Sequence, residues 1–283
     1  MTGCRLLLCF SLGIFSAASS GCSYYVESDR AQCTIDSDCA ALGSNYAKYV
    51  CLDSVCQAPV DPTWTCLNGS SADATASGTV HVSMTMIDLL SQKPLPGIAL
   101  TLCAKLDGTC LFPLASFVSN DAGQMDVEMN AGFDGYFQAA GAGIYPTLIF
   151  PPNTRRQRAP STLPMVPASF FGTMFRGIGM TVADDRSVIL TTALDCQGRP
   201  AAGLSLASPQ ADAQTVSYLL AGGVPSRAAA STDETGVGGF VNIPSGSAVV
   251  TSTIAATNRL AGTAGVQTRA GYLSMVLVMP SGG

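Results

Sequence analysis

Charged side chains are scarce in this sequence. Only 12% of the 283 residues are Asp, Glu, Lys or Arg, and the formal net charge is −5, whereas an average soluble protein is about 25% charged. A protein that follows nucleic-acid phosphates needs a basic stripe, so the composition argues against nucleic acid as a partner. Hydrophobic residues reach 47%, which is enough for a packed core and excludes general disorder.

Histidine is almost missing, and this limits catalysis. Nucleophilic hydrolysis needs a base beside Ser or Cys, and the single histidine, His81, falls on the solvent side of an alternating strand. Asp184 and Asp185 lie in a polar turn, where a weak calcium site is the alternative to a solvated loop. The glycines of residues 236–239 lack the Lys-Ser/Thr of a phosphate loop. The sequence therefore predicts no enzyme, no catalytic residue, no cofactor and no metal.

The N-terminus carries an apolar run that is too short to span a bilayer, which takes about 20 residues. Arg5 precedes the run, and small residues follow it up to Gly21. This order is typical of a secretory signal peptide, so residues 1–21 are predicted to be removed on export. Ser19-Ser20-Gly21-Cys22 resembles a bacterial lipobox, although Ser19 stands where an aliphatic residue is usual. Lipidation of Cys22 is therefore the prediction, and ordinary cleavage with a free or paired Cys22 is the alternative.

The cysteines fit an oxidising compartment. Of the 11 cysteines, two lie in the signal, Cys22 carries the predicted lipid, and the remaining eight form an even set, as closed disulfides require. Residues 22–66 hold a tether and a cysteine-rich module with few apolar residues, so crosslinks must replace a core. Four cysteines allow three connectivities, of which we favour the interleaved one, Cys33–Cys51 with Cys39–Cys56. Zinc is the alternative, but the module contains no C-x2-C pair.

Residues 67–150 alternate with the period of β-strands. From Thr79, Val80 and Val82 face one way while His81 and Ser83 face the other, and turn residues recur about every ten positions. Short strands with this spacing indicate a β-sandwich. Residues 151–180 read as a proline-rich connector, with a short helix over residues 170–175. Its arginines, Arg155, Arg156 and Arg158, belong to a solvated linker, to a protease-sensitive site or to a contact for an anionic glycan or lipid headgroup.

Residues 181–283 repeat the first half and form a second predicted β-sandwich. The turn glycines Gly97 and Gly203 are 106 residues apart, and Gly123 and Gly236 are 113 apart. A difference this small indicates a loop insertion between two copies of one unit. The fold class is therefore all-β, with two tandem transthyretin-like or immunoglobulin-like β-sandwiches after a small disulfide-rich segment.

The order of turns and strands in both copies resembles the carboxypeptidase regulatory-like family, a transthyretin-like sandwich. The resemblance rests on Pro94-Leu95-Pro96-Gly97 and Asp121-Ala122-Gly123 in copy one. In copy two it rests on Gly198-Arg199-Pro200 and Thr232-Asp233-Glu234-Thr235-Gly236. It implies a non-catalytic module for support, adhesion or ligand contact. Copy one departs from the pattern at Cys103 and Cys110, for which a local disulfide is expected, and this leaves Cys66 and Cys196 to pair by elimination.

Together these features predict an exported lipoprotein with a structural or binding role. Its predicted location is the outer membrane or cell surface by lipid anchor, and otherwise the periplasm or the extracellular space. The membrane is the expected partner, and a glycan or protein ligand is left open. One alternative is a carbohydrate- or peptide-binding accessory pair, for which Tyr136, Tyr145 and Phe150 would lie exposed on one face. The other is a hydrolase of unrecognised type.

Overall fold

The computed structural model describes residues 31–52, 54–57, 62–68, 78–151, 161–177 and 179–281. The predicted signal peptide, Cys22 and the Arg155, Arg156 and Arg158 cluster lie outside these residues. The chain divides into two compact units, Met1–Pro59 and Val60–Gly283. Across the described residues, no helix is both long enough and apolar enough to cross a membrane.

The first unit is held together by disulfide bonds. It contains a short helix α1 (Asp36–Ala41), a 3-10 turn η1 (Ser44–Tyr46) and a hairpin of β1 (Val50–Leu52) and β2 (Val55–Gln57). Among the described residues of this unit, Cys33, Cys39 and Cys56 are buried, and Tyr49 and Cys51 pack against them. So small a cluster buries too little apolar surface to offset chain entropy without covalent links.

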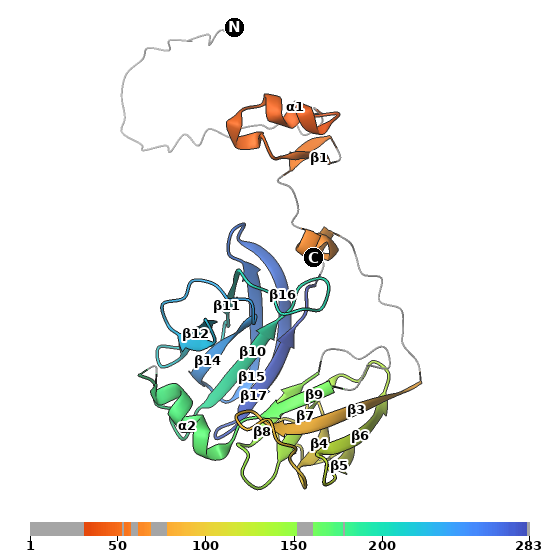
Figure 1. The fold of residues 1–283 in the computed structure, drawn as a ribbon, viewed down its shortest axis with the longest axis vertical. Coiled ribbons are helices and arrows are strands. Elements are labelled where there is room, and N and C mark those ends of the chain that lie inside the picture. The colour runs from red at the N-terminus through yellow and green to blue at the C-terminus, as the bar shows by residue number, and fades with distance from the viewer. Residues whose placement is uncertain are drawn as a thin grey trace, which may run out of the picture. The chain divides into compact units, whose positions relative to one another are not determined.

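The second unit is built around one nine-stranded sheet with the order β13-β12-β14-β10-β17-β8-β7-β4-β5 (Figure 1). Its first-half strands are β4 (Ala99–Ala104), β5 (Ala115–Val118), β7 (Gly135–Ala140) and β8 (Thr147–Phe150). Its second-half strands are β10 (Ser187–Ala193), β12 (Val216–Ala221), β13 (Val224–Ser226), β14 (Val237–Ile243) and β17 (Leu273–Val278). The halves join where β8 and β17 pair in parallel.

Two three-stranded sheets complete the two sandwiches. One has the order β6-β3-β9, with β3 (Thr79–Asp88), β6 (Gln124–Asn130) and β9 (Ser161–Met165). The other has the order β11-β15-β16, with β11 (Leu204–Ala207), β15 (Gly246–Ile254) and β16 (Arg259–Thr268). The predicted fold class is confirmed, since two β-sandwiches follow a small disulfide-rich segment.

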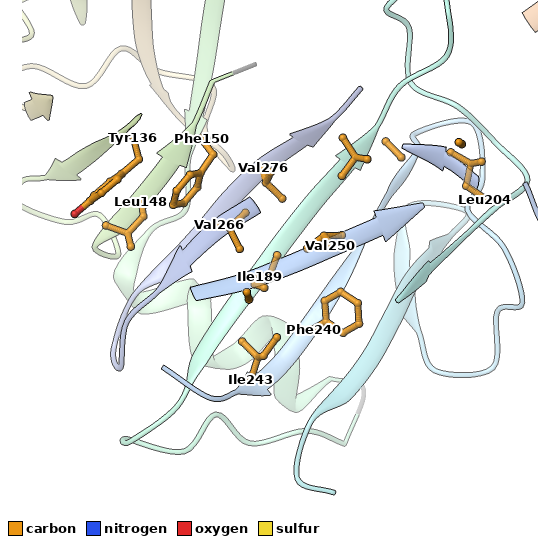
Figure 2. Packing of buried hydrophobic residues seen from close by; sticks show 14 of the residues in the cluster. Tyr136, Leu148, Phe150, Ile189, Leu204, Phe240, Ile243, Val250, Val266 and Val276 are labelled. Carbon is orange, nitrogen blue, oxygen red and sulfur yellow. The ribbon is translucent and has the colours of Figure 1, made fainter. Parts of the chain in front are cut away.

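The two small sheets cover opposite faces of the nine-stranded sheet. Residues paired across strands share a face, so Ile149 and Met275 lie on one face and Phe150 and Val276 on the other. Ile149 belongs to the core beneath the β6-β3-β9 sheet, whereas Phe150 and Val276 belong to the core beneath the β11-β15-β16 sheet. Figure 2 shows Tyr136, Leu148 and Phe150 of the first half in that second core. The sandwiches are therefore fused through a common sheet.

The segment predicted as a connector is partly structured. Its residues 161–165 form β9, an edge strand that pairs in parallel with β3. An edge position tolerates Pro164, because no further strand needs its missing N–H. The helix α2 (Ala168–Arg176) follows and buries Phe171 and Phe175. It packs on the same face of the nine-stranded sheet as β6-β3-β9, over the part of that face that these three strands do not cover. The 3-10 segment η2 (Pro62–Asn68) precedes the first sandwich.

Candidate functional site

The eight cysteines that remain after Cys22 form four disulfide bonds. The structure joins Cys33 to Cys51, Cys39 to Cys56, Cys66 to Cys196, and Cys103 to Cys110, with Cα–Cα distances of 5.7, 5.4, 5.6 and 5.3 Å. These are the pairs that the sequence analysis favoured. The sulfurs of Cys33, Cys39 and Cys56 lie within 4.8 Å of one another. Because each of them is oxidised, this group offers no thiolate to a metal.

The segment η2 is fastened to the second sandwich. The side chain of Trp64 is 6% exposed and belongs to the core that Figure 2 shows in part. The Cys196 N–H donates to the Thr63 carbonyl at 3.1 Å, and the Arg259 Nη2 donates to the Leu67 carbonyl at 2.7 Å. With the Cys66–Cys196 bond, these contacts fix the chain before it enters the first sandwich.

The two copies of the repeat carry the same buried turn. Ser119 Oγ donates to the Leu95 carbonyl and accepts the Ile98 N–H, at 2.7 and 2.9 Å. Thr232 Oγ1 does the same in copy two, where it donates to the Ala201 carbonyl at 2.8 Å and accepts the Leu204 N–H at 3.1 Å. Both hydroxyls are buried.

The two copies also share a glycine, which lies four residues after the buried hydroxyl residue in each. Gly123 and Gly236 have φ of +73° and +64°, and an added Cβ would meet the Met86 and Ala193 carbonyl oxygens respectively. The shared motifs are therefore turns that hold each sandwich closed, and they bring no reactive group to a cleft.

An apolar groove lies where the two halves meet. Its volume is 330 Å³, within the usual range of ligand sites. Its floor is the open face of β10, β17 and β8, with Leu190, Met275 and Ile149, and its wall is the edge strand β9 with Leu163. No lining residue is charged, and Thr162 and Thr192 are among the few polar ones. The groove can accept a neutral, apolar group and has no acid or base for chemistry.

The candidate catalytic residues are not assembled into a site. His81 is exposed on β3, and Asp184 and Asp185 are exposed in a turn before β10. Gly236 turns the chain into β14, and the glycines that follow belong to that strand. Within the part of the chain that the structure describes, every carboxylate with a shifted pKa is shifted downward, as for Asp195, whose oxygens accept N–H groups of Gln197 and Arg199. General acids need the opposite shift.

The predicted aromatic face is wrong. Tyr136 is 0% exposed and Phe150 is 8% exposed, and their rings stack with centroids 5.4 Å apart inside the core. Tyr145 stacks on Phe171 of α2 at 3.5 Å. Burial raises the pKa of both tyrosines. The alternative of a carbohydrate- or peptide-binding accessory pair requires these rings at the surface. The shared sheet instead gives both of its faces to cores, so the rings cannot form a sugar-binding platform.

Comparison with known proteins gives distant likenesses only. No protein-family model matches the sequence, and no curated protein matches it. Among solved structures, the Bacillus anthracis TIE protein covers 72% of this chain at 12% identity and a TM-score of 0.26, and this chain covers 34% of it. The shaft pilin SpaA from Lactobacillus rhamnosus GG covers 73% at 13% identity, with 99% of its own length matched and a TM-score of 0.25. A streptococcal ancillary pilin covers 72% at 12% identity, with 69% of its length matched and a TM-score of 0.23. Likenesses this distant indicate no function for this chain.

Proposed function

We propose that this chain is an exported, lipid-anchored and non-enzymatic structural module of the cell surface, built from two sandwiches of the carboxypeptidase regulatory-like kind. The observation that carries the proposal is the Cys66–Cys196 disulfide, which spans 130 residues. Strands β3 to β10, including the whole first sandwich, lie between these two cysteines. A covalent bridge around a complete sandwich shortens the covalent path between the two ends of the chain, which suits a tether under load.

The disulfide determines the path of a force between the two ends of the chain. Tension that enters at the N-terminus reaches Cys66, crosses to Cys196 and continues into β11 to β17. The chain between Cys66 and Cys196, which includes the first sandwich, lies outside this covalent path, so the intact disulfide prevents that chain from being extended. The buried Trp64 and the Arg259 bond to the Leu67 carbonyl reinforce the entry point.

Single-molecule force spectroscopy of the exported chain, pulled from its two ends, tests this role. We expect the double variant Cys66→Ser/Cys196→Ser to release about 45 nm more contour length than the oxidised chain, from about 3.5 Å for each of the 130 enclosed residues. The control is Cys103→Ser/Cys110→Ser, whose disulfide encloses only a short loop with a separation of 7. Equal lengths for the wild type and the Cys66/Cys196 variant would refute the load path.

The lipid anchor is tested separately. Cys22 lies outside the described residues, and its lipidation rests on the signal-like N-terminus and on the pairing of all other cysteines of the exported chain. Labelled palmitate is expected to enter the wild type and to be lost in Cys22→Ser. Incorporation that persists in the variant would contradict the anchor. Mass spectrometry of the non-reduced protein reports the cleavage site, the lipid and the disulfides in one measurement.

The groove supports a second candidate, the binding of an apolar ligand. Its lining is uncharged and its wall, β9, is an edge strand to which an extended chain can add. We expect a fluorescent apolar probe to bind the wild type and to bind at least tenfold more weakly to Thr192→Trp, which fills the groove. A similar change in Thr263→Trp, an exposed position on β16, would assign probe binding to the general surface.

A further inference from the structure

An exposed apolar cluster lies at the end of the nine-stranded sheet. In the loop 105–114, between β4 and β5, Leu106 is 94% exposed, Leu111 72%, Phe112 79% and Leu114 60%. Val118, at the far end of β5, is 64% exposed. We call these five residues the edge cluster. Single exposed apolar residues are ordinary, but so many within thirteen positions of one strand and its loop indicate an interaction surface.

The loop that carries the edge cluster is held rigidly. The Cys103–Cys110 bond closes it, and the buried Tyr136 hydroxyl donates to the Asp107 carbonyl at 2.5 Å. Arg269 Nη2 donates to the Gly108 carbonyl at 2.6 Å, and the Phe112 N–H donates to Asp107 Oδ2 at 2.8 Å. A loop fixed in this way loses little entropy when it binds. Its apolar side chains are therefore presented in a preset arrangement.

Strand β5 adds an open edge beside the cluster. It is the last strand of the sheet, and its residues Ala115–Val118 include no charge and no proline. Natural edge strands usually carry such features because they prevent pairing with another chain. The strand at the opposite edge, β13, has such a feature, because it contains Pro225. The Ser119 N–H donates to the Ile98 carbonyl of the chain leading into β4, so the backbone groups of Ser119 point toward β4. Backbone groups alternate in direction along a strand, so the N–H and C=O of Ser116 and Val118 point away from β4, toward the open edge.

We propose that β5 pairs with β5 of a second copy of this chain, antiparallel and two-fold symmetric about Ser116. Leu114 and Val118 stand two residues before and two residues after Ser116. The symmetric pairing therefore brings the side chain of Val118 of each copy next to the side chain of Leu114 of the other. The Leu114 N–H already donates to the Leu102 carbonyl at 2.8 Å, so the central backbone hydrogen bonds of the pairing are those between the two Ser116 residues. An isologous contact of this kind is the commonest form of homo-oligomer, and the pairing continues the sheet from one copy into the next.

The exposed area of the edge cluster fits a contact with a second copy of this chain. Five apolar side chains that are each more than half exposed present on the order of 500 Å² to water. The edge of β5 and the flanking loop bring the contact close to the roughly 800 Å² per partner of a stable interface. The neighbouring charges, Lys105 and Asp134, already pair with each other at 2.9 Å. The Asp107 carboxylate of the same loop accepts the Phe112 N–H, so the edge cluster offers no unpaired cation to anionic lipid headgroups.

Sedimentation velocity tests the association. We expect the exported chain with Cys22→Ser to dimerise at concentrations between about 1 and 100 µM, and Val118→Lys to raise the dissociation constant at least tenfold. Val224→Lys is the matched control, because Val224 is 60% exposed on the opposite edge of the same sheet, and it should change nothing. A wild type that stays monomeric overturns the proposal, and so does a loss of dimer in Val224→Lys. A monomer that binds neutral phosphatidylcholine vesicles through Phe112 would assign the edge cluster to lipid instead.

Cysteine crosslinking tests the register. In the proposed pairing the two copies of residue 116 face each other about 5.5 Å apart, within reach of a disulfide. Ser116→Cys is therefore expected to form a covalent dimer under mild oxidation. The two copies of residue 118 would be about 13 Å apart, so Val118→Cys should stay monomeric on a non-reducing gel. Crosslinking by Val118→Cys in place of Ser116→Cys would overturn the pairing about Ser116.

Discussion

Gly123 and Gly236, one in each copy of the repeat, hold positions where any other residue would lower the stability of the fold. Gly236 has φ of +64°, and a Cβ there would meet the Ala193 carbonyl oxygen and, at 2.8 Å, the Ala201 nitrogen. We expect Gly236→Ala to lower the free energy of unfolding by about 3 kcal/mol or more, because strain and steric overlap add. Urea denaturation measures the change.

Gly203 supplies the control for that prediction. Its φ is +78°, but a Cβ there would meet nothing within 4 Å. Gly203→Ala therefore carries the backbone strain alone, at about 1–2 kcal/mol. Equal losses in the two variants would show that the contact with the Ala193 carbonyl adds nothing.

An ion pair on the second sandwich makes stability depend on pH. The Arg186 Nη1 lies 2.7 Å from Asp212 Oδ2, and this hydrogen bond, followed by that of Thr215, lowers the pKa of Asp212 to about 2. A carboxyl with a lowered pKa stabilises the fold above its unfolded pKa, here 3.8, and loses that contribution as the pH falls through about 2. The stability difference between wild type and Asp212→Asn should therefore be constant above about pH 4 and shrink below it.

The measurement is a set of urea midpoints between about pH 7 and pH 2.5. Asp185→Asn, in an exposed turn, serves as the matched variant. A difference for Asp212→Asn that keeps its full size at the lowest pH would contradict the role of the ion pair.

At the scale of the residue, the sequence predicts what depends on local alternation. The side chains of β3 face inward and outward as expected, with Val80 and Val82 buried and His81 exposed. It fails for Tyr136 and Phe150, whose burial depends on a sheet that comes from the other half of the chain. The sequence also does not predict the exposure of Phe112. Phe112 stands in the apolar run Leu111-Phe112-Pro113-Leu114, and such residues are usually buried.

At the scale of the element, helix α2 covers the part of the nine-stranded sheet that neither small sheet reaches. Phe175 is 0% exposed and makes edge contacts with Phe171 and Tyr218, at 5.3 and 5.7 Å between ring centroids. We expect Phe175→Ala to cost about 3–5 kcal/mol, the range for large cavities in cores. Phe170→Ala, at a half-buried position of the same helix, should cost about 1 kcal/mol. Thermal unfolding compares the two variants, and equal costs would mean that α2 is not packed as described.

The helix was predictable and the strand before it was not. The spacing of Phe171 and Phe175 places both on one helix face, which is a local signal. The prolines around β9 favour a connector, and only its pairing with β3, whose residues are far away in sequence, makes Ser161–Met165 a strand. The groove has the same origin, since its floor and wall come from β17, β10, β8 and β9.

At the scale of the whole molecule, the halves are joined by long-range contacts that a repeat pattern does not contain. Sequence periodicity predicts two sandwiches in tandem but does not predict how their sheets are joined. The parallel pairing of β8 with β17 instead merges them, because the last strand of each copy lies beside the other. Phe150 then belongs to the core of the second sandwich although it ends the first.

This fusion predicts cooperative unfolding of the second unit. Trp64 is the sole tryptophan and is buried against the second sandwich, whereas far-UV circular dichroism reports the strands of both. Because breaking β8 from β17 exposes both cores, we expect the fluorescence and dichroism transitions in urea to coincide, as in a two-state system. Phe150→Ala should lower both midpoints together. If the sandwiches were independent, a second transition would appear in dichroism without a change at Trp64, and the common sheet would not be the element that makes them one folding unit.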